Sequence, residues 1–264
     1  MKLLTYNCCC PRAVEQGKII CTECEEIERL YQMQDNKIEV LNHGHVRLVE
    51  SMGSDLSIVR NARVSYDAEW RSGEDEGKDA KLLDYLVRNH HTSPLESVQF
   101  TFDVKAPIFV FRQWHRHRTW SFNEVSARYS VLPEEYYIPE VSQITTQSTS
   151  NKQMRTDEVH PHAETFQRAV SDQCAQAFSL YRRLIAAGMP RELARGVLPM
   201  NTFSHMFATV DLHNLSHFLR LRLHAHSQYE IRVYAEAMLK LIEPIVPVTV
   251  AALRKHTLGV TNAQ

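Results

Sequence analysis

Strand-like segments lie early in this sequence and helix-like segments lie mostly late, and that order constrains the fold most. Residues 37–52 alternate polar and apolar side chains around an "NHGH" turn, as two paired strands would. Residues 97–106, "SVQFTFDVKA", alternate in the same way. The regular strand and helix alternation of a doubly wound sheet is missing. We therefore predict an α+β fold, with a mixed or antiparallel sheet packed against several long helices.

Apolar residues at three-and-four spacing predict the helices. They are expected at residues 55–66, 79–91, 162–188, 190–199, 211–226 and 229–246, with a short buried helix starting at Pro107. Residues 201–210 are expected to form a further strand, and the polar segment 142–158, which has no period, a mobile surface segment.

One main domain is expected at residues 37–264, because no Pro/Gly/Ser-rich linker interrupts it. Residues 1–36 form a separate extension that holds five of the six cysteines. Cys21 and Cys24 have the spacing of half a zinc site, and two of the three cysteines at 8–10 would supply the other half. A reduced, metal-free extension is the alternative. Without a membrane-length apolar run or a signal peptide, we expect a cytoplasmic protein.

Positive charge is concentrated in residues 112–130, "RQWHRHRTWSFNEVSARYS", although the 30 basic and 31 acidic residues of the whole chain nearly balance. Gln113, Arg116 and His117 share one face at the end of the short helix. Cations at a helix C-terminus complement the helix dipole, which is the structural explanation. Guanidinium groups also fork onto phosphate oxygens, and the chain has no glycine-rich phosphate loop. This stretch therefore predicts a nucleotide site.

The helix expected at 211–226 carries polar groups on two faces. Arg222 falls within its apolar stripe, while His213 and His217 lie on the opposite face. A buried guanidinium needs a partner, so Arg222 meets either a ligand or an acid such as Glu230. Polar groups on both faces predict that two surfaces approach this helix, as the surfaces of two subunits would.

Two weaker patterns have structural explanations. Ser93 to Glu96, "SPLE", matches a capping box with proline at the first helical position. The 14 histidines include close pairs but no H-E-x-x-H motif, so we predict no metal in the main domain.

The stretch "RHRTWSFNEVS", Arg116 to Ser126, matches the R-H-R-x7-S motif of one enzyme family. The stretches "HTSPLE", "VKAPIFVFRQW", "SARYS", "PRELAR" and "DLHNLSHFLRLR" follow the same family's order between about residues 37 and 257. The chain therefore resembles the flavin-dependent thymidylate synthases, the ThyX family.

The resemblance implies a methyltransferase that converts dUMP to dTMP. The implied carbon donor is 5,10-methylenetetrahydrofolate, FAD is the redox carrier, and NADPH is the reductant, although the sequence leaves NADH open. It also implies an α+β homotetramer with active sites between subunits. Its partners would be small molecules, with no nucleic acid or membrane.

The resemblance also implies the roles of individual residues. Arg222 would be the catalytic cation at the uracil ring, while Ser126 binds substrate, since no base can be assigned to activate it. The implied dUMP contacts are Gln113, Arg116, Glu124, Ser126, Ala127, Arg128, Arg195 and Arg222. The implied FAD contacts are Ser93, Glu96, Arg116, His117, Arg118, Asn123, Glu124, Asp211, His213 and His217. The segment around Ser93 departs from the family's pattern at Ser93, Leu95 and Ser97.

The competing hypothesis is a single-stranded nucleic-acid-binding protein that uses the same arginines. Trp114, Trp120 and Tyr129 would then serve as stacking platforms for bases. A visible absorption spectrum separates the two, because only the enzyme would carry a flavin.

Overall fold

The computed structural model describes residues 36–259. The chain divides between Lys37 and Ile38, and the fold is described for the second unit. The predicted cysteine-bearing extension and its zinc site lie outside the described residues. Among the described helices, none is both long enough and apolar enough to cross a membrane.

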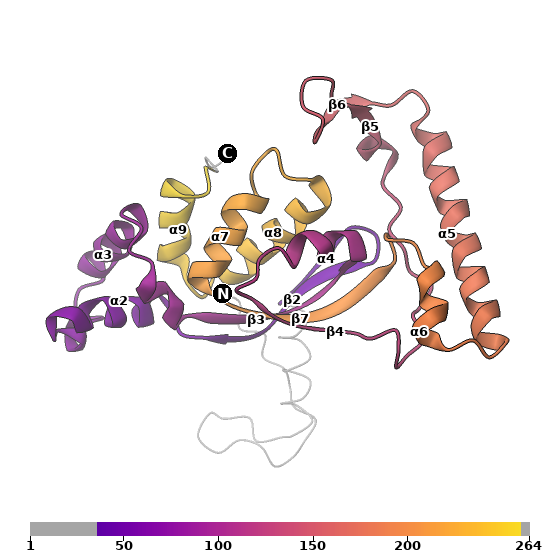
Figure 1. The fold of residues 1–264 in the computed structure, drawn as a ribbon. Helices are drawn as coiled ribbons and strands as arrows, with labels where there is room; N and C mark the ends of the chain where they lie inside the picture. Colours follow the sequence, from indigo (N-terminus) through magenta and orange to yellow (C-terminus); the bar gives the residue numbers. More distant parts are fainter. Residues whose placement is uncertain (1–35, 260–264) are drawn as a thin grey trace, which may run out of the picture. The chain divides into compact units, whose positions relative to one another are not determined.

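A five-stranded sheet in the order β1-β2-β3-β7-β4 forms the centre of this unit (Figure 1). Its pairings β2–β3, β3–β7 and β7–β4 are antiparallel, which confirms the predicted α+β class. The strands are β1 (Lys37–Val40), β2 (Gly44–Met52), β3 (Gln99–Pro107), β4 (Ser121–Glu124) and β7 (Phe203–Asp211).

The core lies between this sheet and three helices, α4 (Ile108–Trp114), α7 (Leu212–Arg222) and α8 (Tyr229–Ile242) (Figure 1). Strand alternation puts the apolar side chains of β3 on the helix side. The fully covered ones there are Phe100, Phe102, Val104 and Ala106, and Val98 just before the strand is covered as well, each at most 1% exposed. Each large apolar side chain buried in this way contributes roughly 1.5–3 kcal/mol to folding.

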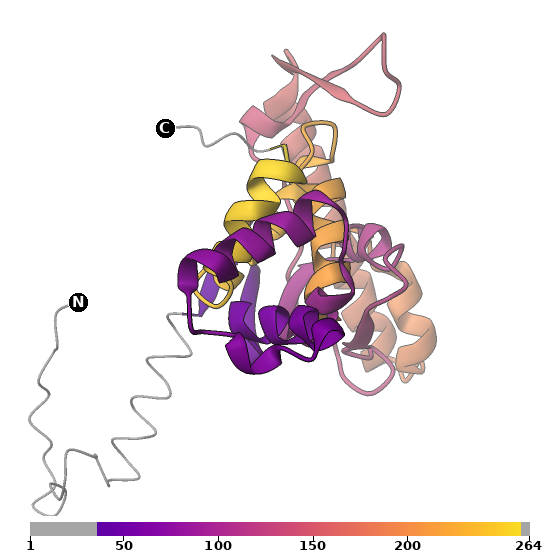
Figure 2. The same ribbon diagram turned by 90° about the vertical axis from the view of Figure 1, so that its left-hand side faces the viewer.

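A second group of helices packs at one end of the sheet. It consists of α2 (Asp55–Arg63), the 3₁₀ turns η1 (Val64–Tyr66) and η2 (Glu69–Arg71), α3 (Glu76–Arg88), η3 (Ser93–Ser97) and α9 (Pro247–His256). Figure 2 shows α9 beside α3. The Asp55 carboxylate accepts the backbone N–H groups of Val248 and Thr249 at 2.9 and 3.0 Å. Asp55 belongs to α2, but its carboxylate lies at the start of α9. There it satisfies backbone N–H donors that have no partner within α9.

At the other end, the long helix α5 (Ala163–Ala186) and the short α6 (Arg191–Ala194) have a small core of their own (Figure 1). Helix α5 ends at Ala186, two residues before the Gly188 at which the sequence predicted its end, and the φ of +88° at Gly188 suits glycine. This end also contains η4 (Val141–Gln143), β5 (Thr145–Gln147), β6 (Arg155–Val159) and η5 (Arg195–Val197).

Three of the local predictions differ from the structure as follows. The segment 142–158 contains the antiparallel pair β5–β6, whose Thr146 and Thr156 hydroxyls bond across the strands at 2.5 Å. Ser93 opens a 3₁₀ turn instead of capping a helix, and the turn has no side-chain cap. Helix α7 ends at Arg222, so the predicted helix to residue 226 is four residues too long.

Candidate active site

Phe218 fixes the arginine-rich loop onto helix α7. Trp114, at the end of α4, stacks on the Phe218 ring with centroids 4.9 Å apart, and Trp120, after the loop, lies 5.1 Å from the same ring. His117, in the loop itself, meets Phe218 at 4.9 Å. Because both ends of the loop pack on one buried ring, residues 115–119 have little freedom to move.

Arg222 reaches this loop from the last turn of α7. Its Nε donates to His117 Nε2 at 3.1 Å, and its Nη2 donates to the Gln113 carbonyl oxygen at 2.9 Å. Within residues 36–259, neither Arg222 nor Arg116 nor Arg118 pairs with a carboxylate. The buried Arg222 thus has partners, as the apolar stripe required, but they are His117 and the Gln113 carbonyl, and in the described chain the ion pair with Glu230 is not formed.

The cluster is electrostatically unfavourable without an anion. Burial, and next the charge of Arg116, lower the pKa of Arg222. Burial, followed by Arg222 and His217, lowers the pKa of His117 to about 4. Guanidinium groups gathered without acids are stabilised when a phosphate or another anion binds between them.

The start of α7 supplies further polar groups beside η3. Gln99, just after η3, pairs with Asp211 across the sheet, and the Leu212 N–H donates to the Val98 carbonyl at 2.8 Å. Asp211 caps α7 by accepting the Asn214 N–H at 2.9 Å. His213 Nδ1 is buried without a hydrogen-bond partner in the described part of the chain. A buried ring nitrogen without a partner can form a hydrogen bond with a polar atom of a ligand.

Strand β4 brings two more predicted residues to the sheet. Asn123 and Glu124 lie opposite Phe207 and Met206 of β7, and Glu124 accepts the Ser204 hydroxyl at 2.6 Å. After Glu124 the chain turns, since the Tyr129 N–H donates to the Ser126 carbonyl at 3.0 Å. Alternation along an extended strand therefore does not continue to Arg128.

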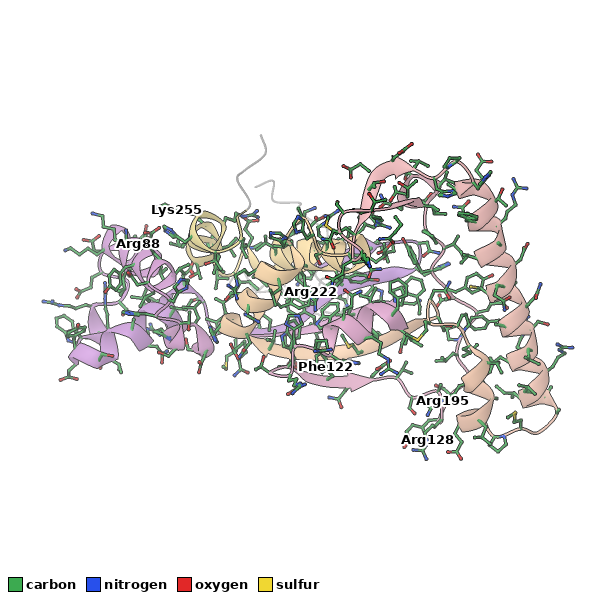
Figure 3. All side chains as sticks on the ribbon, turned by 45° about the horizontal axis from the view of Figure 1, so that its top comes forward. Arg88, Phe122, Arg128, Arg195, Arg222 and Lys255 are labelled. Atoms are coloured by element: carbon green, nitrogen blue, oxygen red, sulfur yellow. The ribbon has the colours of Figure 1, made fainter. Side chains whose placement is uncertain are left out.

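The remaining predicted arginines lie elsewhere. Arg128 pairs with the Glu192 carboxylate at 3.4 Å, and Arg195 Nε donates to the Glu192 carbonyl at 3.3 Å. Arg128 and Tyr129 also line a cavity of about 420 Å³ with Gly188 to Glu192. Figure 3 shows Arg128 and Arg195 at the α6 end, apart from Arg222. One chain thus carries two separate groups of the predicted site residues.

The predicted site residues lie in two separate groups and in the elements beside the first group. The group around α4 and α7 comprises Gln113, Arg116, His117, Arg118, His213, His217 and Arg222. Next to it on η3, β4 and β7 are Ser93, Glu96, Asn123, Glu124 and Asp211. The group at the α6 end comprises Arg128 and Arg195, with Ser126 and the buried Ala127 in the connecting turn.

Sequence reasoning missed one cluster of titratable groups. Asp103 of β3 accepts from His45 and Arg47 of β2 and contacts His205 of β7. The two imidazoles and the carboxylate lie close enough together to hold a metal ion. However, Arg47 binds the second Asp103 oxygen at 2.6 Å and already neutralises the carboxylate. The cluster draws on three strands, so no local sequence pattern could have indicated it.

The tryptophans of the competing hypothesis are not available to bases. Trp114 and Trp120 are 0% and 6% exposed, respectively, and both pack in the core. Only Tyr129 of the three proposed platforms, at 79% exposed, remains on the surface. Base stacking needs an exposed ring face, so the nucleic-acid-binding hypothesis loses two of its three contacts.

Comparison with known proteins agrees with the geometry. A family model described as "Thymidylate synthase complementing protein" matches residues 47–248. A flavin-dependent thymidylate synthase of Treponema denticola is 45% identical over 224 residues, which are 84% of this chain and 83% of that protein. The enzyme of the same name from Thermus thermophilus is 47% identical over 222 residues, covering 84% and 79%.

A solved structure supports the same grouping. The UMP/dUMP methylase PolB from Streptomyces cacaoi, bound with 5-Br dUMP, superimposes with a TM-score of 0.76 at 36% identity. The match covers 84% of this chain and 99% of that one.

Proposed function

Because this chain belongs to the flavin-dependent thymidylate synthase family, we propose that it converts dUMP to dTMP. The carbon comes from the methylene group of 5,10-methylenetetrahydrofolate. A methylene carbon becomes a methyl group only with two further electrons, which NADPH supplies through FAD. The enzyme is a methyltransferase whose partners are small molecules, and we place it in the cytoplasm with those cosubstrates.

The observation that carries this proposal is the contact of Arg222 with the R-H-R loop. Three arginines and Gln113, which carries a side-chain amide, gather there. In the described chain no carboxylate pairs with these arginines. That set suits a nucleotide, with anionic phosphate and two uracil carbonyl oxygens that accept hydrogen bonds.

The residues beside it fit an FAD molecule. His213 offers an unpartnered buried ring nitrogen, and Arg116 and Arg118 offer unpaired charge for the two phosphates. Ser93, Glu96, Asn123, Glu124, Asp211, His117 and His217 complete the proposed FAD set. FAD supplies the redox chemistry when it is bound, and the protein supplies position and charge.

The chemical task of Arg222 is to stabilise charge on the uracil ring. Addition at the ring carbons pushes electron density toward the N3–O4 edge. Arg222 is held by two hydrogen bonds, so its charge is already oriented and little reorganisation is needed. Ser126 binds substrate, and the described contacts give it no basic partner, since its hydroxyl accepts the Arg128 N–H at 3.3 Å.

We propose that two chains complete each site in a homotetramer. Arg128 and Arg195 lie away from Arg222 in one chain, so a neighbouring chain must bring the second group to the first (Figure 3). Apolar side chains exposed at that end support an interface there. They include Phe166 and Leu180 of α5, Leu193 of α6, and Met200, at 37–59% exposure.

The test is a spectrum and an assay on the same purified protein. We expect flavin absorption bands, and dTMP formation that requires dUMP, methylenetetrahydrofolate and NADPH together. A protein that stays colourless after incubation with FAD and forms no dTMP would contradict the proposal. Sedimentation of the active protein as a monomer would contradict the shared site alone.

A further inference from the structure

Glu230 is a buried carboxylate to which the reaction assigns no role. It is 3% exposed at the start of α8. Tyr137 donates its hydroxyl to Glu230 Oε1 at 3.2 Å, and Arg155 approaches the same oxygen at 3.5 Å. The other oxygen, Oε2, accepts from the Gln228 side-chain amide at 2.8 Å. A buried acid with an arginine and two hydrogen-bond donors is held as an ionised acceptor.

The charge of Glu230 determines which group donates and which accepts in the next two hydrogen bonds. A carboxylate only accepts, so Gln228 must present its Nε2 to Glu230 and its Oε1 in the opposite direction. That oxygen accepts from Gln113 Nε2 at 2.6 Å. Gln113 thus directs its NH₂ group to Gln228 and uses one of its two N–H donors there, and its own Oε1 has no partner among residues 36–259.

Gln113 lies within the group proposed to bind the nucleotide. Its backbone carbonyl accepts from Arg222 Nη2 at 2.9 Å, which ties it to the cation expected at the uracil ring. Either end of a glutamine amide can point at a ligand, and turning it over exchanges an acceptor for a donor. Glu230 removes this ambiguity, although no contact with substrate is expected of it.

We propose that Glu230 is a positioning residue that, through Gln228, makes Gln113 present its carbonyl oxygen to dUMP. This inference rests on the proposed function. At neutral pH dUMP has two hydrogen-bond donors, the uracil N3–H and the sugar 3′-hydroxyl, because the ionised phosphate only accepts. Gln113 Oε1 receives one of these two. A turned amide would place NH₂ against that donor and weaken binding.

The first experiment is steady-state kinetics of Glu230→Gln in the flavin-loaded enzyme. The new amide can donate or accept, so the relay loses its fixed direction. We expect KM for dUMP to rise about tenfold, the usual effect of losing one good hydrogen bond, with kcat changed less. Flavin content and the apparent KM for NADPH should stay at native values. The Gln228→Met variant, which leaves the buried carboxylate in place, should give the same rise.

Tyr137→Phe is the matched control, because it removes a donor from Glu230 without touching Gln228. Its KM for dUMP should remain native. The decisive variant combines Gln113→Glu with Glu230→Gln. The amide at 230 then donates to Gln228 Oε1, and Gln228 donates to the carboxylate at 113, so the relay runs in reverse and still ends on an acceptor. The double variant should recover most of the lost affinity, whereas Gln113→Glu alone should not.

Two substrate analogues identify the donor. Methylation of N3 removes the base donor, and 2′,3′-dideoxyuridine monophosphate lacks the sugar donor. The analogue that lacks the donor bound by Gln113 should bind the native enzyme poorly. Glu230→Gln should reduce the affinity for this analogue only slightly further.

A native KM in both Glu230→Gln and Gln228→Met would overturn the inference while the reaction stands. A raised KM that the double variant does not lower would overturn it too, since Glu230 would then act by packing alone. If the native enzyme forms no dTMP, the proposed function fails and this inference fails with it.

Discussion

Arg222 Nε lies 3.1 Å from His117 Nε2 and donates to it. A guanidinium has no acceptor, so this ring nitrogen must carry a lone pair, and the imidazole is neutral. The lowered pKa of His117, about 4, agrees with that geometry. In the R-H-R motif the two arginines therefore supply the charge, while the histidine between them orients Arg222.

Acid should weaken the fold through His117. Its folded pKa of about 4 is below the ordinary 6.5, so the unfolded chain takes up the proton first as pH falls. The stabilising contribution is complete above about pH 6.5 and is lost between there and pH 4. We expect His117→Gln, whose amide oxygen can still accept from Arg222, to lose less stability over this window. Urea unfolding midpoints at several pH values would measure the difference, and parallel curves would contradict it.

Removal of the Arg222 side chain should abolish turnover without unfolding the protein. A preorganised charge at the transition state typically contributes about 10²–10³ in kcat. We expect Arg222→Ala to lose at least that much, with its melting temperature within a few degrees of native. Arg88→Ala, which removes an exposed arginine far from the site, is the control (Figure 3). Near-native turnover by Arg222→Ala would show that another group stabilises the ring.

Two inactive variants should complement each other. Arg222 and Arg195 belong to the two separate groups of one chain, so a shared site takes one arginine from each of two subunits. Coexpressed Arg222→Ala and Arg195→Ala chains would then form some sites with both arginines. We expect up to roughly a quarter of native activity, because each randomly mixed pair keeps one intact site. Activity no higher than that of the separate variants would mean that each chain builds its own site.

Asp103 should matter for stability in a pH-dependent way. Burial alone would raise the pKa of Asp103, but hydrogen bonds from His205, His45 and Arg47 outweigh it and hold the pKa well below its usual value. The contribution is present above about pH 4 and is lost as pH falls further. Asp103→Asn leaves Arg47 unpaired and should cost roughly 2–4 kcal/mol at neutral pH. As the pH falls below about 4, the unfolding midpoint of Asp103→Asn should also decrease less than that of the native protein. An unchanged midpoint at pH 7 would refute this.

Local sequence patterns correctly predicted many of the buried residues. Alternation placed Phe100 and Phe102 in the core, and three-and-four spacing placed Leu215 and Phe218 on the buried face of α7. These patterns work because a side chain's direction depends on its own backbone period. They failed at the turn after Glu124 and in the pair β5–β6, where hydrogen bonds between nearby backbone and hydroxyl groups decide the path.

By itself, the sequence determined the α+β class, the apolar stripe of α7 that contains Arg222, and the cationic stretch that follows α4. Tertiary structure alone decided that Arg222 meets His117 and not Glu230, that Trp114 and Trp120 are covered, and that Arg128 lies with Arg195. The reason is physical: the period of the local backbone determines which side a residue faces, while its partner is determined by packing between segments far apart in the sequence.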